Sequence, residues 1–281
     1  MIERRFVQCD VFAKVALMGN GLAVVVDGAG LDERSMQGFA AWTNLSETTF
    51  LMPPTHPDAD YKVRIFTPTR ELAFAGHPTL GSCAAWLHTG GVPKRRQAVV
   101  QECNIGNVMI DLSGELPGFV APPTQVTGMN PQVQARILAA LGIDPSMLAS
   151  AVVLDNGSIW HLLELRTAAA VLQIDAAAVA ALPDMGIGLM GRSVTGAASN
   201  YDVRMLSARS PRNEDPITGS LNAAVGKWLL GQGRLTAPTV MAQGIKVGRN
   251  GCVHLLPGPI GSGQVLVAGR THILIDGKVR L

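Results

Sequence analysis

Hydrophobic and polar residues alternate along some stretches of the first half of the chain and recur at helical spacing along others. Residues 61–67 alternate Tyr, Val and Ile with polar residues, and this period of two predicts a strand. Residues 78–88 begin with proline and then place leucine and alanine on one face, which predicts a helix. The same reasoning predicts a helix over 31–43, strands at 6–12, 21–26 and 48–53, and a hairpin formed by 98–102 and 107–112.

The second half repeats this order after a stretch rich in proline and glycine at 116–127. The segments VRIFTPTRELAFAGHPTLGS and VRMLSARSPRNEDPITGS both run from a strand through a loop to a helix, half the chain apart. This order favours a tandem duplication, which would place two helix N-termini across one cleft. The elements predicted here are helices at 132–141, within 168–182 and at 218–230, and strands at 151–154, 159–164 and 202–206.

Composition narrows the class of protein. Hydrophobic residues make up 47% and charged residues 16%, which favours a compact soluble protein with a large core. The net charge is only +2, and the basic triplet Lys94-Arg95-Arg96 follows a glycine-rich turn, so a nucleic-acid partner is not expected. No apolar run approaches the roughly 20 residues of a membrane helix, so no membrane partner is expected either.

The four cysteines, Cys9, Cys83, Cys103 and Cys252, have neither CxxC spacing nor a Cys/His metal pattern, so no metal site is expected. The first residues do not read as a signal peptide, and together these features predict reduced thiols in a cytoplasmic protein. The segment GHPTLGS lacks the lysine of a nucleotide-binding P-loop, and GNG lacks the third glycine of a dinucleotide fingerprint.

Two predicted helix starts carry residues suited to proton transfer. His77 precedes one helix and Asp215 the other, and Gly219 and Ser220 follow Asp215 closely. A helix N-terminus offers unpaired N–H groups and partial positive charge to a carboxylate or phosphate, and glycine lets the ligand approach the backbone. An imidazole beside a carboxylate can handle protons. Two plainer readings stay open: Asp215 caps its helix, and His77 is a hydrogen-bonded core histidine.

A third candidate is Glu47 in the stretch NLSETTF. A carboxylate buried among apolar neighbours has a raised pKa and can then donate and accept protons near neutrality. The alternative is a surface glutamate in a turn.

Five stretches, taken in order and at their separations, resemble the motifs of the phenazine-biosynthesis PhzF-like family: MGNGLAVV, NLSETTF, VRIFTPTRELAFAGHPTLG, EDPITGS and QGIKVGR. The resemblance covers nearly the whole chain. It implies an α+β fold of the diaminopimelate epimerase-like type, in which two pseudo-symmetric domains each wrap an antiparallel sheet around a central helix. The expected domains are 1–118, joined by a returning C-terminal strand at 271–281, and 119–270.

The resemblance also implies an activity and its residues. The family's namesake isomerises trans-2,3-dihydro-3-hydroxyanthranilate on the way to phenazines, without a cofactor and as a homodimer. Its general acid/base corresponds to Glu47, and its other catalytic positions correspond to His77 and Asp215. Residues at or beside its substrate-binding positions are Ser46, Gly76, Gly219 and Ser220.

These observations predict a cofactor-independent isomerase that moves a proton between carbons of a small, carboxylate-bearing substrate. An epimerase or racemase with Glu47 and Asp215 as opposed bases is the second hypothesis, and a non-catalytic protein that binds small acids is the third. Neither helix-start motif begins with cysteine, so two-thiol racemase chemistry is disfavoured. Leu221 and Asn222 replace the smaller residues common in the family and are expected to affect which substrate fits.

Overall fold

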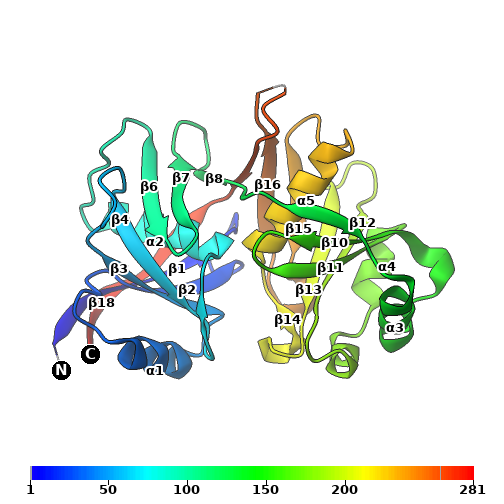
Figure 1. Cartoon of the computed structure of the whole chain (residues 1–281), viewed down its shortest axis with the longest axis horizontal. Coiled ribbons are helices and arrows are strands. Elements are labelled where there is room, and N and C mark those ends of the chain that lie inside the picture. Colours follow the sequence, from blue (N-terminus) through cyan, green and yellow to red (C-terminus); the bar gives the residue numbers. More distant parts are fainter. Residues whose placement is uncertain (1, 260) are drawn as a thin grey trace. The chain divides into compact units, whose positions relative to one another are not determined.

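The computed structural model describes residues 2–259 and 261–281, which fall into two compact units (Figure 1). Unit 1 contains the described residues up to Val120 together with Ala268–Leu281, and unit 2 contains those of Ala121–Val267. In the described part of the chain, no helix is both long enough and apolar enough to cross a membrane.

Unit 1 is a mixed sheet with one helix on each face. Its strands follow the hydrogen-bonded order β18, β1, β2, β3, β4, β6, β7 and β8, with the short β5 also paired to β4. Neighbours are antiparallel except β2 with β3 and β4 with β6. The elements are β1 (Glu3–Val11), β2 (Asn20–Val25), α1 (Glu33–Thr43), β3 (Glu47–Met52), β4 (Tyr61–Phe66), β5 (Glu71–Leu72), α2 (Gly76–His88), β6 (Ala98–Cys103), β7 (Gly106–Asp111), β8 (Gly118–Val120) and β18 (Thr271–Arg280).

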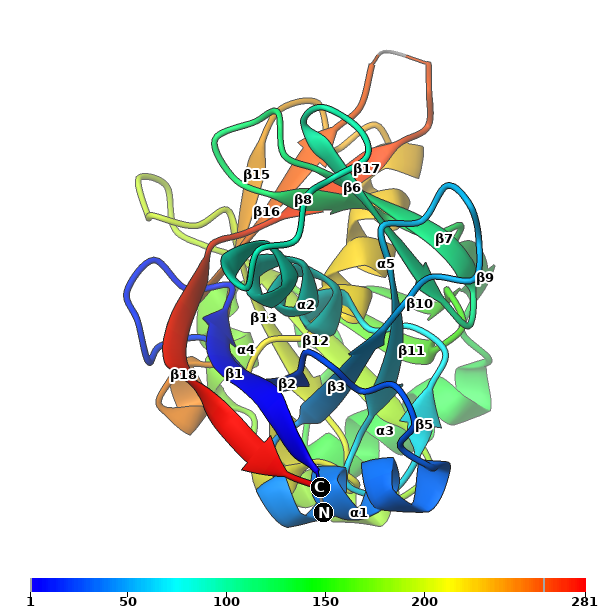
Figure 2. The ribbon, with the colours of Figure 1, turned by 90° about the vertical axis from the view of Figure 1, so that its left-hand side faces the viewer.

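The helix α2 is the central helix of unit 1. It contacts β1, β2, β3 and β18, and Figure 2 shows it surrounded by these strands and β8. The amphipathic α1 packs on the opposite face, where Met36 and Phe39 join Phe50 and Phe66 in one apolar cluster. Successive side chains of a strand point to opposite faces of the sheet. The apolar residues of these strands therefore pack in two layers, one against α2 and one against α1.

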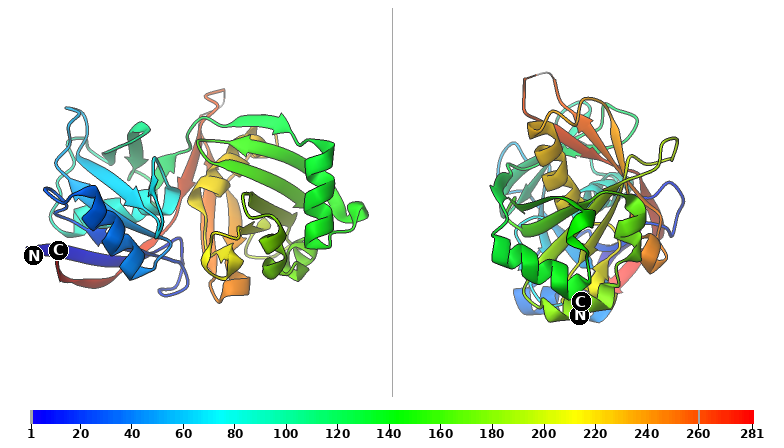
Figure 3. Two further views of the ribbon diagram at one scale, coloured as in Figure 1. Left: turned by 60° about the horizontal axis from the view of Figure 1, so that its bottom comes forward. Right: turned by 90° about the vertical axis from the view of Figure 1, so that its right-hand side faces the viewer.

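Unit 2 repeats the arrangement with α5 on one face of its sheet and α3 and α4 on the other (Figure 3). Leu163, Ile187 and Leu189 face the α3 and α4 layer, whereas Leu162 and Gly188 lie toward Leu221 of α5. The helices and strands are β9 (Gln125–Gly128), α3 (Pro131–Leu141), β10 (Leu148–Asp155), β11 (Ile159–Leu165), α4 (Ala168–Gln173), β12 (Gly186–Arg192), β13 (Tyr201–Leu206), β14 (Glu214–Asp215), α5 (Gly219–Gly231), β15 (Thr239–Gln243), β16 (Gly251–Pro257) and β17 (Val265–Ala268). Short 3-10 turns are η1 (Pro145–Met147), η2 (Ala176–Ala181), η3 (Pro211–Asn213) and η4 (Ile245–Val247).

The internal duplication extends to strand direction. In unit 2, β11 pairs in parallel with β12 and β13 with β15, at the places where unit 1 has β2 with β3 and β4 with β6. A two-residue strand precedes the central helix in each unit, β5 before α2 and β14 before α5. This common order confirms the predicted α+β fold with two pseudo-symmetric halves.

The register of the repeat differs from the one that the motifs suggest. The central helices begin at Gly76 and Gly219, so His77 corresponds to Ser220, the second residue of each helix. Asp215 lies in β14 and corresponds to Leu72 of β5. The loop between the short strand and the helix has the same length in both units, but the loop before the short strand is longer in unit 2, at 207–213, than in unit 1, at 67–70.

The strand β12 has no clear pattern in the sequence because three of its seven residues are glycine. Glycine disfavours strands, and the segment GIGLMGR does not alternate cleanly. The structure explains the composition: a Cβ atom on Gly188 would lie 2.9 Å from Leu221 Cδ1, and one on Gly191 would lie 2.4 Å from the carbonyl oxygen of Thr167. Glycine is therefore required in β12, because α5 packs closely against Gly188 and the residue before α4 packs closely against Gly191.

Candidate active site

Glu47 stands at the first position of β3, directly after a sharp turn. Asn44 ends α1 in the left-handed conformation, with φ of 53°, and its N–H donates to the carbonyl of Ala40 at 3.3 Å. Glu47 is the register partner of Leu22 on the parallel strand β2. Leu22 faces α2, because a Cβ atom on Gly81 of that helix would lie 2.5 Å from its Cδ2. Glu47 therefore lies on the α2 face of the sheet.

His77 is the second residue of α2 and is buried in its first turn. Pro78 follows it at a place where a helix has no intrahelical acceptor for the missing N–H. The helix is fastened to β3 by Ser82, whose hydroxyl donates to Thr49 Oγ1 at 2.9 Å. Both of these residues are fully buried, so the bond sets the position of α2 along the strand that begins with Glu47.

The two side chains meet. His77 Nε2 lies 3.3 Å from Glu47 Oε2, and the side chains are 4% and 16% exposed. On the other side of the ring, the Asn20 amide nitrogen lies 3.4 Å from His77 Nδ1. Burial lowers the pKa of His77 to about 3, because a buried imidazolium loses its hydration. The imidazole is therefore neutral at neutral pH.

Asp215 belongs to unit 2, where it is buried at the end of β14. Its Oδ2 accepts a 2.5 Å hydrogen bond from the Thr218 hydroxyl. Gln243 donates to the carbonyl of Asp215 at 3.3 Å and to Thr218 Oγ1 at 3.0 Å, and it accepts from the N–H of Thr218 at 3.1 Å. The N-cap position of α5 is Thr218, three residues after Asp215.

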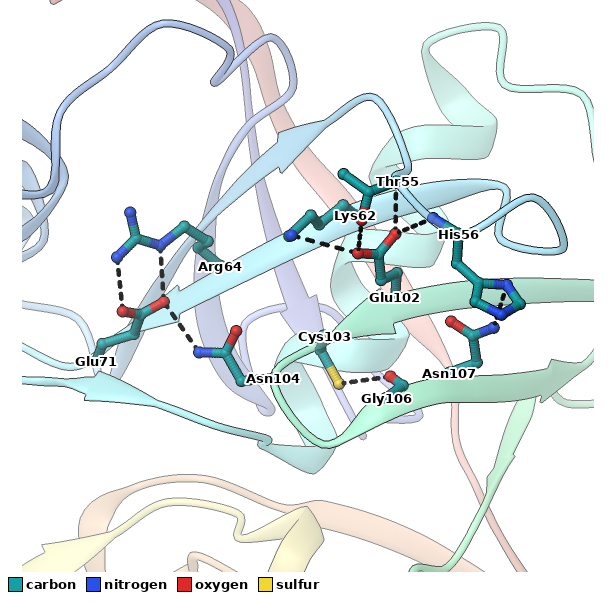
Figure 4. Close-up of polar contacts among 10 residues, drawn as sticks. All are labelled: Thr55, His56, Lys62, Arg64, Glu71, Glu102, Cys103, Asn104, Gly106 and Asn107. Carbon is teal, nitrogen blue, oxygen red and sulfur yellow. Dashed lines mark hydrogen bonds and ion pairs between the residues drawn. The ribbon is translucent and has the colours of Figure 1, made fainter.

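A bidentate arginine–glutamate pair holds the short strand ahead of each central helix. In unit 2, Arg204 donates to Glu214 through Nε at 3.1 Å and Nη2 at 2.6 Å, and both side chains are 1% exposed. In unit 1, Arg64 and Glu71 make the equivalent contacts at 2.8 and 2.6 Å, and Asn104 also reaches Glu71 (Figure 4). The hydrogen bonds from Arg64 lower the pKa of Glu71. Glu214 directly precedes Asp215, so its pair fixes the backbone that carries the candidate carboxylate.

The two central helices differ from the other α-helices at their N-termini. Asp32, Asn130 and Thr167 cap α1, α3 and α4 with their side chains. The N-caps of α2 and α5, Ala75 and Thr218, make no such bond, and neither first turn contains an acidic residue. Both helix starts therefore direct N–H groups and partial positive charge at the residues that precede them, an arrangement suited to an anion.

The structure brings together part of the site expected from the sequence. Glu47 and His77 are in contact within unit 1. Their sequence neighbours there are Ser46, which is half-buried, and Gly76, which opens α2. Asp215 lies in unit 2, followed there by Gly219 and Ser220 at the start of α5. The role of each of these residues stays a prediction.

Several residues around these groups are absent from the sequence-based prediction. Asn20 contacts His77 from the start of β2, and only its position inside the motif MGNGLAVV indicated it. Asn156 donates to the carbonyl of Ser220 at 2.8 Å, and nothing in its local sequence indicates this. Leu221 and Asn222, which are expected to affect which substrate fits, are both buried: Leu221 packs against Gly188, and Asn222 donates to Gln243 at 2.9 Å. Among the described residues, no group of His, Cys, Asp and Glu is arranged to hold a metal ion.

Comparison with known proteins agrees with this architecture. The profile of a family described as phenazine biosynthesis-like protein matches residues 9–277. Antisense-enhancing sequence 1 of Schizosaccharomyces pombe is 33% identical over 99% of this chain and 99% of its own length. The trans-2,3-dihydro-3-hydroxyanthranilate isomerase of Pseudomonas aeruginosa is 34% identical over 77% of this chain and 76% of its own.

The solved structures show the same fold. A phenazine biosynthesis protein of the PhzF family from Bacillus anthracis matches 100% of both chains with a TM-score of 0.81 and 19% identity. Curated relatives named as isomerases confirm the expected class of enzyme, an isomerase. The length of the profile match and the identity to these relatives show that the chain belongs to the phenazine biosynthesis-like (PhzC–PhzF) protein family.

Proposed function

We propose that this protein is a cofactor-independent isomerase that moves a proton between two carbons of a small carboxylate-bearing substrate, with Glu47 as general acid/base. The contact that supports this proposal is the one between Glu47 and His77, at 3.3 Å on the α2 face of unit 1. The relatives named trans-2,3-dihydro-3-hydroxyanthranilate isomerase favour a substrate of that type, a ring bearing a carboxylate and an amino group.

The proposed reaction needs one base and no change of oxidation state. Glu47 removes a proton from one carbon, the electron pair of the broken C–H bond delocalises over the adjacent double bond, and the protonated Glu47 returns the proton to another carbon. His77 is neutral near neutral pH, since burial lowers its pKa to about 3, and it is therefore a weak competitor for that proton. We therefore assign the transfer of the substrate proton to Glu47 rather than to His77.

The substrate carboxylate is proposed to bind at the uncapped helix starts. The backbone at Gly76 and Gly219 has no side chain to obstruct the approach of a ligand, and the Ser220 hydroxyl can donate to a carboxylate. Ser46, next to Glu47, is proposed to contact the same substrate.

Asp215 is proposed to orient the substrate or to relay a second proton. Its carboxylate is held by the Thr218 hydroxyl, and its backbone by the Arg204–Glu214 pair. A residue restrained in this way loses little freedom when a substrate binds, which is the property expected of an orienting group. Homodimer formation and a cytoplasmic location stay predictions.

Racemase chemistry by a pair of thiols has less support. Burial raises the pKa values of Cys9 and Cys83 to about 12, so neither supplies a thiolate near neutrality. The second residues of the two central helices are His77 and Ser220.

The test is turnover of trans-2,3-dihydro-3-hydroxyanthranilate in D₂O, with product followed by NMR and mass spectrometry. A shifted double bond in the product supports the proposal, and deuterium at the new carbon reports that the proton on Glu47 exchanges with solvent before it is returned. Inversion at a stereocentre without a double-bond shift, or binding without a double-bond shift, contradicts it. Glu47→Gln should lower kcat by about 10²–10⁴-fold, the usual contribution of a general acid/base. Glu115→Gln, at an exposed glutamate, is the matched control and should leave kcat unchanged.

A further inference from the structure

We propose that Asn20 is a positioning residue that fixes the tautomer of His77, so that the single ring proton resides on Nε2, the nitrogen that lies next to Glu47. This inference rests on the proposed function, because it assigns a role to the partner of the proposed base.

The assignment follows from the two contacts of the imidazole ring. The Asn20 amide nitrogen, 3.4 Å from Nδ1, can only donate a hydrogen bond. Nδ1 must then present its lone pair, and in a neutral ring the single proton resides on Nε2. That nitrogen lies 3.3 Å from Glu47 Oε2, an acceptor when the carboxylate is ionised.

Asn20 is held firmly enough to impose this choice. It is 2% exposed and is the first residue of β2, opposite Val11 on β1. The turn before it is fastened by Asp10, whose Oδ2 accepts from the N–H of Gly19 at 2.9 Å. A Cβ atom on Gly19 would lie 2.3 Å from the carbonyl oxygen of Val11, so the turn can approach β1 this closely only with glycine.

The tautomer affects the resting state of Glu47. With the proton on Nε2, the partial positive charge of that N–H group lies close to the carboxylate oxygen, 3.3 Å from Nε2, and stabilises the ionised form of Glu47, which is the form that can abstract a proton. With the proton on Nδ1, the Nε2 lone pair would face Glu47 Oε2 and would favour a protonated carboxyl instead. Asn20 thereby acts on the proposed base through His77, from the far side of the ring.

The experiment is ¹⁵N NMR of the imidazole nitrogens in histidine-labelled protein without substrate, with the His77 signals assigned by comparison with His77→Asn. The proposal expects the Nε2–H tautomer in the wild type. Asn20→Asp replaces a donor with an acceptor of the same shape and should move the proton to Nδ1. Asn20→Ala removes the donor and should give a mixture of tautomers, so it decides the question if the aspartate variant does not fold.

A matched control is available in the same unit. The Asn107 amide nitrogen lies 2.9 Å from Nδ1 of His56 on the surface (Figure 4), so Asn107→Asp makes the same chemical change beside another histidine. It should leave the His77 signals and turnover unchanged. Asn20→Asp and Asn20→Ala should lower kcat about 10–100-fold, the usual effect of removing a group that orients a functional side chain, with a smaller change in KM.

An Nδ1–H signal in the wild type, or an Nε2–H signal that both Asn20 variants leave unchanged, would overturn the proposal. The tautomer is measured without turnover, so this result is distinct from failure of the proposed function. If Glu47→Gln keeps full activity while the Nε2–H signal depends on Asn20, the catalytic role of Glu47 is wrong and the tautomer assignment stands.

Discussion

Ser82 and Thr49 share a hydrogen bond of 2.9 Å between their hydroxyl oxygens, and both residues are fully buried. The bond connects α2 to β3 shortly after His77 on the helix and shortly after Glu47 on the strand. It therefore sets where the imidazole stands relative to the carboxylate, without either residue touching a reacting atom.

Ser82→Ala should lower the free energy of unfolding by about 1 kcal/mol, the usual net value of one internal hydrogen bond. Because the hydrogen bond between α2 and β3 is then lost, His77 is held less firmly beside Glu47, and kcat should also fall. Urea denaturation and steady-state kinetics measure the two effects. Ser113→Ala, at an exposed serine, should change neither value. An unaffected kcat in Ser82→Ala would show that other contacts set the position of α2.

His77 should make the protein less stable as the pH falls. Its pKa is about 3 in the folded protein because of burial, against an ordinary value near 6.5 in the unfolded chain. Between these values the unfolded chain binds a proton that the folded protein does not, so stability present above about pH 6.5 is lost as the pH falls toward 3.

The measurement is the free energy of unfolding of the wild type and His77→Asn at pH 7 and pH 4.5. The advantage of the wild type should shrink by a few kcal/mol at the lower pH. Glu47 faces the imidazole, so the comparison is repeated in Glu47→Gln to remove its own titration. A difference that is constant with pH would contradict the assigned shift.

The two arginine–glutamate pairs should differ strongly in their effect on stability. Arg204→Met leaves Glu214 buried without its partner and should cost about 3–5 kcal/mol. Arg64→Met removes the equivalent pair, whose side chains are each 22% exposed, and should cost about 1 kcal/mol or less.

Chemical denaturation of both variants tests this difference. The double variant Arg204→Met/Glu214→Leu should recover much of the loss, because apolar side chains can replace a buried ion pair. Equal losses in the two single variants would show that burial does not separate the pairs.

The thiols of Cys9 and Cys83 should resist alkylation in the native protein. Burial, with a smaller contribution from Asp10 for Cys9 and from Asp60 for Cys83, raises their pKa values to about 12. Iodoacetamide at pH 8 should label them only on the timescale of unfolding, whereas both react readily in urea. Peptide mapping by mass spectrometry identifies the labelled positions. Rapid native labelling of either residue would reopen the thiol-based mechanism.

The sequence predicted the helices and strands of the first half of the chain well, because hydrophobic and polar residues alternate strongly there and the helix starts are clear. Residues 61–67 and 78–88 correspond to β4 (Tyr61–Phe66) and α2 (Gly76–His88) within a residue or two. It failed at β12, where packing against α5 and the start of α4 requires glycine and removes the strand signal. It also misaligned the repeat, because the motifs do not show that the loop before the short strand is longer in unit 2 than in unit 1.

The sequence by itself determined the family, the duplicated α+β plan and the residues that can handle protons, because these depend on residue type and order. Only the tertiary structure decided that Glu47 meets His77 at 3.3 Å, that Asn20 contacts the ring from its other side, and that the Thr218 hydroxyl donates to Asp215. Each of these contacts joins side chains from different strands, helices or turns. Their geometry depends on how strands and helices pack, which the local sequence does not encode.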